Sequence, residues 1–518
     1  MAGPFTSPLR SRWLLVLLLL PGCLWIFRDA EIESVQAAAD STVAVTSPVR
    51  AHLTNGRTAH FPEGVEVSSR MITGDGTLYD LNYSALGPVT RIPLDSVAAV
   101  ETYRTEYDNP KTFGASLLAT AGAAFLVPTL AVAIFGSCPT VYSDGADGLV
   151  LEAESFPNSI VPLFEQRDVD PLRVAARPDG TVELEVRNEA LETHYINHLE
   201  LIDVRHGEDE YALPAPEGRA FLLRGRSAPS RATDRAGRDV LPPLAAEDYR
   251  VFGTAAATLA GATPDDVMDH VDLVFPRPAA DTVAVVLRLR NSLLNTVYFY
   301  DLMLAGQGAR SLDWLGQDLA SISYAVGLGD FYTQHMGLRV RVWDGSAYRE
   351  SARVGEVGPI AWDDVAVPVR VPDTDSLRVR LHFVADAWRI DGVALADLVA
   401  TVTPRRVPVA EAEAASPLAP PAIEPLVAAP DEDYLITSPG TRFVVRFETG
   451  LAPARGARTF FLAAQGYYTE WIRRDWLEPT ADSTFVPSAT TLHAAMQRWR
   501  EVKPTFEEQF ESSKIPVR

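Results

Sequence analysis

Short stretches in which hydrophobic and polar residues alternate recur along most of the chain, separated by Gly, Pro, Asn and Asp. A period of two gives a β-strand one buried side and one solvent-facing side. Clear cases are 182–186, 283–289, 338–343 and 377–383. Strands at this spacing predict a mainly β fold of tandem β-sandwich modules, Ig-like or jelly-roll-like, with a small N-terminal β domain and one or two hydrophobic helices.

Turn signals and changes of composition divide the chain into segments. A Pro/Ala-rich stretch without aromatic residues is typical of a semi-stiff linker. The strands after it are too few to fold alone, so we expect them to return and pack on the first sandwich. The predicted segments are a signal peptide or anchor at 1–39, the small β domain at 40–110, a hydrophobic membrane-associated segment at 111–137, sandwich modules at 138–262 and 263–403, the linker at 404–430, the returning strands at 431–480, and a short helix and tail at 481–518.

One sequence motif occurs twice, 103 positions apart. Val182 and Leu184 before the first copy match Val285 and Leu287 before the second. The repetition predicts two related sandwich modules. The seven shared residues are Arg187, Asn188, Leu191, Thr193, Tyr195, Leu199 and Leu201, which return as Arg290, Asn291, Leu294, Thr296, Tyr298, Leu302 and Leu304.

The N-terminus has the layout of an export signal. Arg10 and Arg12 precede an uncharged hydrophobic run from Trp13 to Phe27, which predicts a secreted or membrane-tethered protein. Cys23 follows Leu-Pro-Gly in a way that resembles a bacterial lipobox, so lipidation of Cys23 is one possibility. Ordinary cleavage near residues 37–39 and an uncleaved anchor are the others.

A second hydrophobic stretch, Phe113–Phe135, has no charged residue and is long enough for a transmembrane helix. Pro128 interrupts it, so a helical hairpin, a membrane-embedded wedge and a helix docked on protein remain alternatives. With the positive residues before it and none closely after it, we expect a membrane-associated protein whose large C-terminal part lies outside the cytoplasm, in the periplasm or on the cell surface of a bacterium.

Charge and cysteine content exclude some classes of function. The net charge of −22 argues against nucleic acid as a partner, because binding to phosphates depends on Lys and Arg. The two cysteines, Cys23 and Cys138, allow at most one disulfide, and neither forms a CxxC or Cys/His metal spacing. The sequence predicts no metal and no other cofactor.

Several polar and aromatic groups invite a functional interpretation, and each has a structural alternative. His194 and His198 have a helical metal-ligand spacing, but their surroundings alternate like a strand. The acidic stretch 144–148 is more typical of a hairpin turn than of a calcium loop, and 219–238, with six arginines, is predicted to be a polar loop. The possible binding aromatics, which could also be core residues, are Tyr467, Tyr468, Trp471 and Trp476.

No catalytic motif is present in the sequence, and an acidic pair such as Asp363–Asp364 is not evidence of a glycosidase without a defined cleft. The sequence therefore predicts a protein that is not an enzyme. It favours a binding or structural module of the cell envelope, with the membrane and a glycan or envelope protein as partners. The alternatives are a carbohydrate-active or other hydrolase on a β-sandwich scaffold and an oligomeric membrane-assembly component.

Three stretches carry a family resemblance. The motif DRAGRDV at 234–240, together with 438–447 and 458–468, resembles the β-rich C-terminal module of uncharacterised exported bacterial proteins that also contain FG-GAP or tetratricopeptide repeats. The resemblance covers roughly residues 138–480 and implies a location and a fold, because that module has no established activity. FG-GAP calcium loops are missing from this sequence, so a calcium-binding propeller is not implied.

Overall fold

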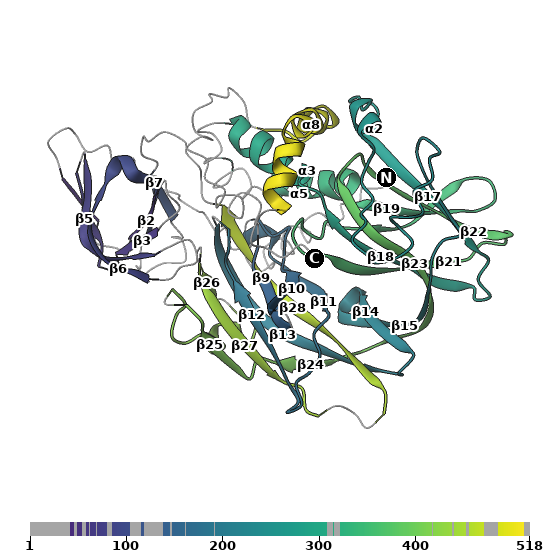
Figure 1. Cartoon of the computed structure of the whole chain (residues 1–518), viewed down its shortest axis with the longest axis horizontal. Helices are drawn as coiled ribbons and strands as arrows, with labels where there is room; N and C mark the ends of the chain where they lie inside the picture. Colours follow the sequence, from purple (N-terminus) through teal and green to yellow (C-terminus); the bar gives the residue numbers. More distant parts are fainter. Residues whose placement is uncertain are drawn as a thin grey trace, which may run out of the picture.

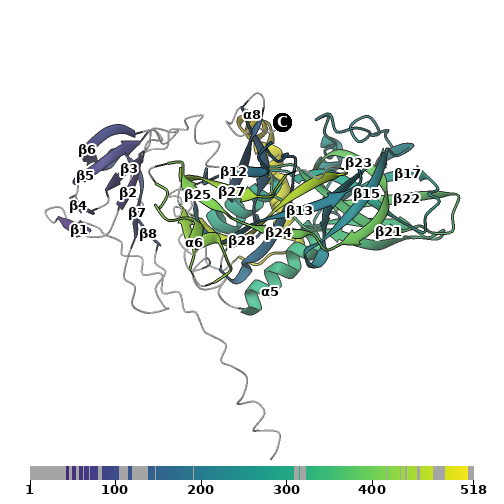
Figure 2. The same cartoon turned by 90° about the horizontal axis from the view of Figure 1, so that it is seen from below.

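The protein is described from a computed structural model, in which five antiparallel sheets make up most of the described chain. The mainly β prediction is therefore confirmed. Figure 1 and Figure 2 show the small N-terminal domain at one end, one sandwich in the middle and a second at the other end. The structure describes residues 42–45, 49–53, 58–61, 63–68, 70–79, 85–103, 115–118, 138–145, 148–160, 162–190, 192–307, 314, 322–416, 418–431, 433–437, 440–451, 455–470 and 485–511.

The small domain is a single sheet with the order β1-β4-β5-β3-β2-β7-β8, and β6 pairs with β5. Its core contains the inward residues of the alternating strands, among them Ala51, Phe61 and Ile72, which are fully buried. The strands are β1 (Val43–Val45), β2 (Val49–Leu53), β3 (Thr58–Phe61), β4 (Val65–Val67), β5 (Met71–Tyr79), β6 (Ala85–Pro93), β7 (Val97–Tyr103) and β8 (Ala115–Leu118).

The hydrophobic stretch predicted as a membrane-associated helix is described only at Ala115–Leu118. These residues form strand β8 at the edge of the small sheet, paired with β7, so a helix is wrong for this part. The hydrophobic pattern could not exclude a strand, because a short hydrophobic run has no periodicity that distinguishes a strand from a helix. The rest of 111–137 lies outside the described residues, as do 1–39 and Cys23. In the described part of the chain, no helix has both the length and the hydrophobicity needed to span a bilayer.

Module 1 is a sandwich of two sheets, with the orders β10-β9-β12-β27-β25 and β11-β28-β13-β24; β26 also pairs with β13. Its core combines residues of both sheets, such as Leu184 and Val445 from one and Leu201 and Leu462 from the other. The strands are β9 (Thr140–Gly145), β10 (Gly148–Glu154), β11 (Gln166–Leu172), β12 (Thr181–Arg187), β13 (Glu192–His206), β24 (Arg405–Pro408), β25 (Glu411–Ala414), β26 (Leu435–Thr437), β27 (Arg442–Glu448) and β28 (Ala457–Glu470).

Module 2 is a second sandwich, with the orders β14-β15-β23-β18-β21 and β16-β17-β22-β19-β20. Residues such as Val285 and Leu287 on one sheet share a core with Val271 and Leu381 on the other. The strands are β14 (Glu210–Ala215), β15 (Arg219–Ser227), β16 (Arg231–Asp234), β17 (Met268–Pro276), β18 (Thr282–Asn291), β19 (Leu338–Trp343), β20 (Tyr348–Val354), β21 (Asp363–Arg370), β22 (Ser376–Val384) and β23 (Trp388–Val402).

The module boundaries differ from those predicted. Residues 210–234, predicted to belong to the first module, form β14, β15 and β16 of module 2, and the arginine-rich stretch 219–238 is therefore largely strand. The predicted linker 404–430 contributes β24 and β25 to module 1, followed by the short helix α6 (Glu424–Val427). A local pattern identifies a strand but does not show which sheet it joins, and edge strands with polar side chains resemble linkers in sequence. After this stretch, β27 and β28 pair with β12 and β13.

The two copies of the repeated motif fold differently, so the duplication hypothesis is wrong beyond the shared strand end. In the first copy, Thr193 and Tyr195 lie on β13, whereas Thr296 lies on helix α3 (Leu294–Val297) and Tyr298 begins the π-helix η4 (Tyr298–Leu304). What both copies share is a strand that leads into Arg-Asn and a buried Asn at its end. Local identity in a few polar and leucine positions does not determine the structure, because tertiary packing overrides weak local preference.

Helices cover one end of module 2. The C-terminal helix α8 (Ala489–Glu511), longer than the predicted short helix, buries Leu492, Met496 and Trp499 against the module core, next to α3 and η4. The same layer contains α5 (Ile322–Phe331) and the π-helix η7 (Tyr332–Met336). Figure 1 shows α8 in yellow beside α3 and α5. This layer closes the sandwich at that end.

Candidate functional site

The two histidines with metal-ligand spacing do not form a pair. Both lie on β13, where a bulge at Asn197 breaks the register between them. His194 is fully buried, with Nε2 3.2 Å from Oε2 of Glu192, and burial lowers its pKa to about 3; His198 is only partly buried. Across the described ranges, no three His, Cys, Asp or Glu side chains are grouped so that they could hold a metal ion.

The proposed aromatic platform is not exposed in its described part. Tyr467 is 3% exposed and stacks on Tyr195, with ring centroids 4.5 Å apart. Tyr468 is also buried and donates a 3.1 Å hydrogen bond from its hydroxyl to the carbonyl of Pro157. Buried rings present no face to a ligand, so these two tyrosines are core residues. Trp471 and Trp476 lie outside the described residues.

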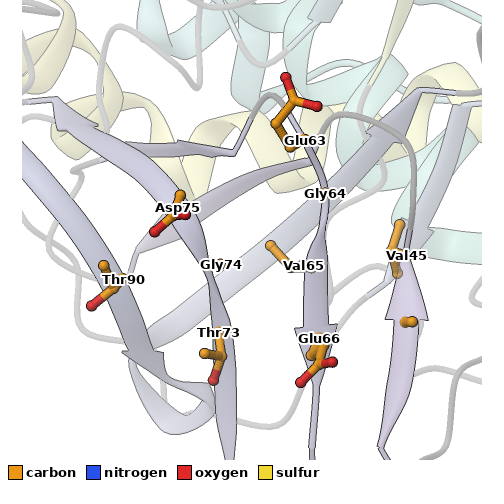
Figure 3. Close-up of a pocket in the computed structure, with 10 residues that line it drawn as sticks. Val45, Glu63, Gly64, Val65, Glu66, Thr73, Gly74, Asp75 and Thr90 are labelled. Atoms are coloured by element: carbon orange, nitrogen blue, oxygen red, sulfur yellow. The ribbon is translucent and has the colours of Figure 1, made fainter.

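A shallow hollow of about 430 Å³ lies on the small domain, between β4 and β5 (Figure 3). Three acidic side chains line it, Glu63, Glu66 and Asp75, and all three are exposed. In Figure 3 they lie at different sides of the hollow and do not converge on one point. This arrangement gives a cation no common set of ligands.

The junction between the two sandwiches contains a better candidate. Glu154, at the end of β10 in module 1, is 1% exposed, and its Oε2 accepts hydrogen bonds from the backbone N–H groups of Ile360 (2.7 Å) and Ala361 (3.3 Å) in module 2. Cys138 donates its thiol to the other oxygen of the carboxylate at 3.4 Å. Burial raises the pKa of Glu154 to about 7, although these hydrogen bonds partly oppose the shift. Glu154 therefore joins the modules at a position that favours its neutral form.

Three more carboxylates lie in this part of the junction, and burial raises the pKa of each of them. Asp168 and Asp170 lie on β11, and Asp363 begins β21 in module 2. Burial raises the pKa of Asp170 well above its usual range, and the neighbouring charges of Asp168, Asp363 and Glu154 add to the rise. Burial and the charges of Asp364 and Asp168 raise the pKa of Asp363 to about 8. Carboxylates grouped in this way cannot all ionise at neutral pH without a large electrostatic cost.

An ion-pair network borders this carboxylate cluster. Arg173 lies just after β11 and contacts Asp364 at 2.8 Å and Glu247 at 2.9 Å through the same nitrogen. Arg288 on β18, which is 6% exposed, contacts Asp364 at 3.4 Å. A charge network held by several partners fixes the positions of its side chains more firmly than a single surface pair does.

Two aromatic rings stand next to the network. The ring of Trp362, immediately before β21, lies over the guanidinium groups of Arg288 and Arg290, at 5.7 Å and 4.9 Å from its centroid. Tyr249 meets Trp362 edge-on at 6.5 Å between ring centroids and is 46% exposed. Cation–π contacts to buried arginines hold the indole in one orientation.

The backbone at Tyr249 is strained. Its φ is +61°, in the left-handed region that L-residues other than Gly, Asn and Asp seldom adopt. The buried carboxylate of Asp391 accepts hydrogen bonds from the N–H groups of Tyr249 (2.6 Å) and Asp248 (3.3 Å) and thereby holds this turn. Strain retained at an exposed aromatic residue is typical of functional surfaces. We call Tyr249, Trp362 and the carboxylates Asp170 and Asp363 the junction site.

Sequence reasoning missed most of the junction site. Asp363 and Asp364 are visible as an acidic pair, but Tyr249, Glu154 and Asp170 are far apart along the chain and carry no motif. Contacts between β11 of module 1 and β21 of module 2 bring their neighbourhoods together. The sequence offers one local signal for an exposed position at Tyr249. It is an aromatic residue in a stretch of Ala, Glu and Asp at 245–249.

Comparison with known proteins gives no assignment. A scan against protein-family models and a search of curated proteins found no match. Solved structures that align with the chain include the GH31 α-xylosidase of Xanthomonas citri (9% identity, 83% of this chain, 38% of that chain, TM-score 0.15). An uncharacterised protein of Listeria monocytogenes EGD-e and the cycloalternan-forming enzyme of Listeria monocytogenes each align at 12% identity over 65% of this chain and 30% of theirs, with a TM-score of 0.15. The chain thus spans well under half of each of these proteins, and likeness at this TM-score carries no argument about activity.

Proposed function

We propose that the chain is an exported, membrane-associated protein of a bacterial cell envelope whose sandwich modules bind a glycan. The signal-like N-terminus and the resemblance of residues 138–480 to a module of exported bacterial proteins support the location. A single structural observation supports binding: an exposed tyrosine, Tyr249, is held in a strained backbone conformation beside Trp362.

A glycan suits this pair better than a peptide does. Sugar rings present flat C–H faces that pack on aromatic rings, while their hydroxyls need nearby charged or polar groups. Both kinds of group are present, because the ring of Trp362 adjoins Asp363 in the chain and rests on Arg288 and Arg290. The rings are positioned before any ligand arrives, which lowers the entropy cost of binding.

Affinity electrophoresis of the full-length chain in detergent tests this proposal. Gels that contain xylan, glucomannan, hydroxyethylcellulose, starch or dextran are compared with gels without polysaccharide. We expect at least one neutral polysaccharide to retard the protein, and Trp362→Ala to restore its mobility. Retardation by none of the five, or equal retardation of the variant, contradicts glycan binding at this site.

The alternative proposal is hydrolysis of a glycan at the same place. It is favoured by one observation, that Asp363, next to Trp362, has a pKa raised to about 8 and lies near Asp170, as a general acid beside a second carboxylate would. Release of reducing ends from the retarding polysaccharide, lost in Asp363→Asn while retardation persists, supports hydrolysis. Retardation without release supports a binding protein.

The third proposal is an oligomeric membrane-assembly component, and it depends on the hydrophobic segment 111–137. Detergent-resistant oligomers that disappear when this segment is deleted would support it.

A further inference from the structure

The outer face of the β16-β17-β22-β19-β20 sheet in module 2 is basic, although the protein as a whole is strongly acidic. Alternate residues of β17, β19 and β22 are buried in the module core, such as Leu273, Val340 and Leu381, so their neighbours point outward. Five arginines occupy the outward positions of β19, β20 and β22, and we call them the basic face. They are Arg339, Arg341, Arg353, Arg378 and Arg380.

Strand pairing places like charges opposite one another on this face. Arg341 pairs with Arg380 on one neighbouring strand, and Arg339 pairs with Arg353 on the other. Directly opposed like charges destabilise a sheet. Burial, together with Arg341 and Arg339, lowers the pKa of His382 in the same row to about 4, so the histidine stays neutral there.

Acidic side chains neutralise only part of the basic face. Arg380 forms two contacts with Asp272, at 2.6 and 2.8 Å, and Arg353 contacts Glu350. In the described part of the chain, no acidic side chain lies within ion-pair distance of Arg341 or Arg378. The Nε atoms of Arg339 and Arg341 also lack a hydrogen-bond partner among the described residues. Five arginines against two paired carboxylates leave an excess of positive charge.

Two aromatic rings lie at one end of these rows. Trp343 pairs with Tyr348 across β19 and β20, and their ring centroids are 5.3 Å apart. The guanidinium of Arg380 lies 4.2 Å from the centroid of the Tyr348 ring. The face therefore combines a flat surface, arginines in successive rows about 7 Å apart along the strands, and aromatic faces.

From this geometry we infer that the basic face binds an acidic polysaccharide, through its carboxylate groups. Guanidinium groups bind carboxylates in a bidentate fashion, and the rows of a sheet can follow a linear polymer whose charges recur at intervals. DNA is a poorer match, because it carries about one charge per 1.7 Å and the net charge of −22 repels so dense a polyanion. This surface is distinct from the junction site and does not depend on the function proposed for it. Figure 1 and Figure 2 show β17 and β22 of this sheet at the end of the molecule farthest from the small domain.

The test measures binding of the full-length chain in detergent to polygalacturonate, with dextran, double-stranded DNA and vesicles containing about 30% anionic lipid as comparisons. The variant Arg341→Gln/Arg378→Gln removes two unneutralised charges. The control Arg219→Gln/Arg224→Gln removes two exposed charges from β15, on the other sheet of the module. Thermal unfolding of both double variants checks that they fold as the unmodified chain does.

We expect polygalacturonate to bind, weakening with added salt, and dextran not to compete with it for the basic face. The basic-face variant should bind about tenfold or more weakly, since removing one charged partner typically weakens such binding several-fold, while the control should weaken by less than about twofold. An equal loss of affinity in both variants would show non-specific attraction and overturn the inference. Absence of polygalacturonate binding, or tighter binding of DNA or of the vesicles than of polygalacturonate, would overturn it too. A Tyr249→Asn variant should bind polygalacturonate unchanged, which separates this surface from the junction site.

Discussion

The backbone N–H of Tyr249 donates a 2.6 Å hydrogen bond to the buried carboxylate of Asp391, and this contact holds Tyr249 at a φ of +61°. The surrounding structure thus supports a conformation that costs a residue with a large side chain about 1–2 kcal/mol. The glycan-binding proposal rests on this exposed ring and on the cost of the backbone conformation that holds it.

Replacing Tyr249 with Asn should stabilise the protein while weakening ligand binding. Asn tolerates the left-handed region, and the exposed tyrosine ring contributes little to the core, so we expect the free energy of unfolding to rise by about 0.5–1 kcal/mol. Chemical denaturation measures the change. A decrease in stability would mean that the ring is a structural element of the turn, and the functional interpretation of the strain would fail.

The contact between Glu154 and the 358–361 segment predicts a sharp difference between two nearby glycines. Gly358 has a φ of +86°, and a Cβ there would clash with the carboxylate of Glu154, whereas a Cβ at Gly355 would meet nothing within 4 Å. Gly358→Ala should therefore destabilise the protein by about 2–4 kcal/mol, from backbone strain and a displaced buried carboxylate, while Gly355→Ala changes stability by less than about 1 kcal/mol. Similar unfolding curves for the two variants would show that the modules do not meet at Glu154.

Stability should fall as the pH rises from about 4.5 to 7. The carboxyl of Glu154 ionises near 4.5 in the unfolded chain and near 7 in the folded protein, so over this window the unfolded state loses its proton first and is favoured. The contribution of this residue alone is about 3 kcal/mol, because one pKa unit corresponds to about 1.4 kcal/mol.

The variant Glu154→Gln keeps a neutral hydrogen-bond acceptor and should flatten this pH dependence. Urea denaturation at about pH 5 and about pH 7.5 measures the difference. Glu208→Gln, a change in the exposed β13–β14 turn, is the control. If the pH dependence of Glu154→Gln equals that of the unmodified chain, Glu154 is not protonated at the junction.

The docking of helix α8 depends on Asp386. This fully buried residue accepts hydrogen bonds from the indole of Trp499 and the ammonium of Lys503, both at 2.7 Å, and pairs with Arg389 at 2.8 Å. Trp499→Phe keeps most of the packing but removes one of these hydrogen bonds, and we expect a loss of about 1–3 kcal/mol.

Arg500→Ala is the matched control, because Arg500 is exposed on the same helix, and it should change stability by less than about 0.5 kcal/mol. Hydrogen exchange of the α8 amides, measured alongside the unfolding curve, should become faster in Trp499→Phe. Unchanged exchange and unchanged stability would mean that packing alone docks the helix.

The class of fold could be predicted from the sequence because alternation is a local property. The strands at 182–186 and 338–343 each show it, and both lie within strands of the structure, β12 and β19. Which sheet a strand joins depends on partners far along the chain, and this explains why the prediction for 210–234 names the wrong module. The prediction of two related modules from the repeated motif was wrong for a related reason. Tyr195 and Tyr298 have similar neighbours in sequence, but Tyr195 lies in a sheet and Tyr298 in a helix.

The candidate site was largely invisible in the sequence. Asp170 and Asp363 acquire their raised pKa values only because the fold brings them together in a buried part of the junction. The strain at Tyr249 has no local signature either, because Tyr is not a residue that favours a positive φ. By contrast, His194, whose spacing drew attention, is a buried strand residue.

The most direct test of the central claim is titration calorimetry with oligosaccharides of the polysaccharide that retards the protein most strongly. The unmodified chain should bind with a measurable heat, Trp362→Ala and Tyr249→Asn should each lose about tenfold or more in affinity, and Trp343→Ala, on the distant basic face, should bind normally. Equal affinity in all four proteins would contradict a glycan site at the junction of the two sandwiches.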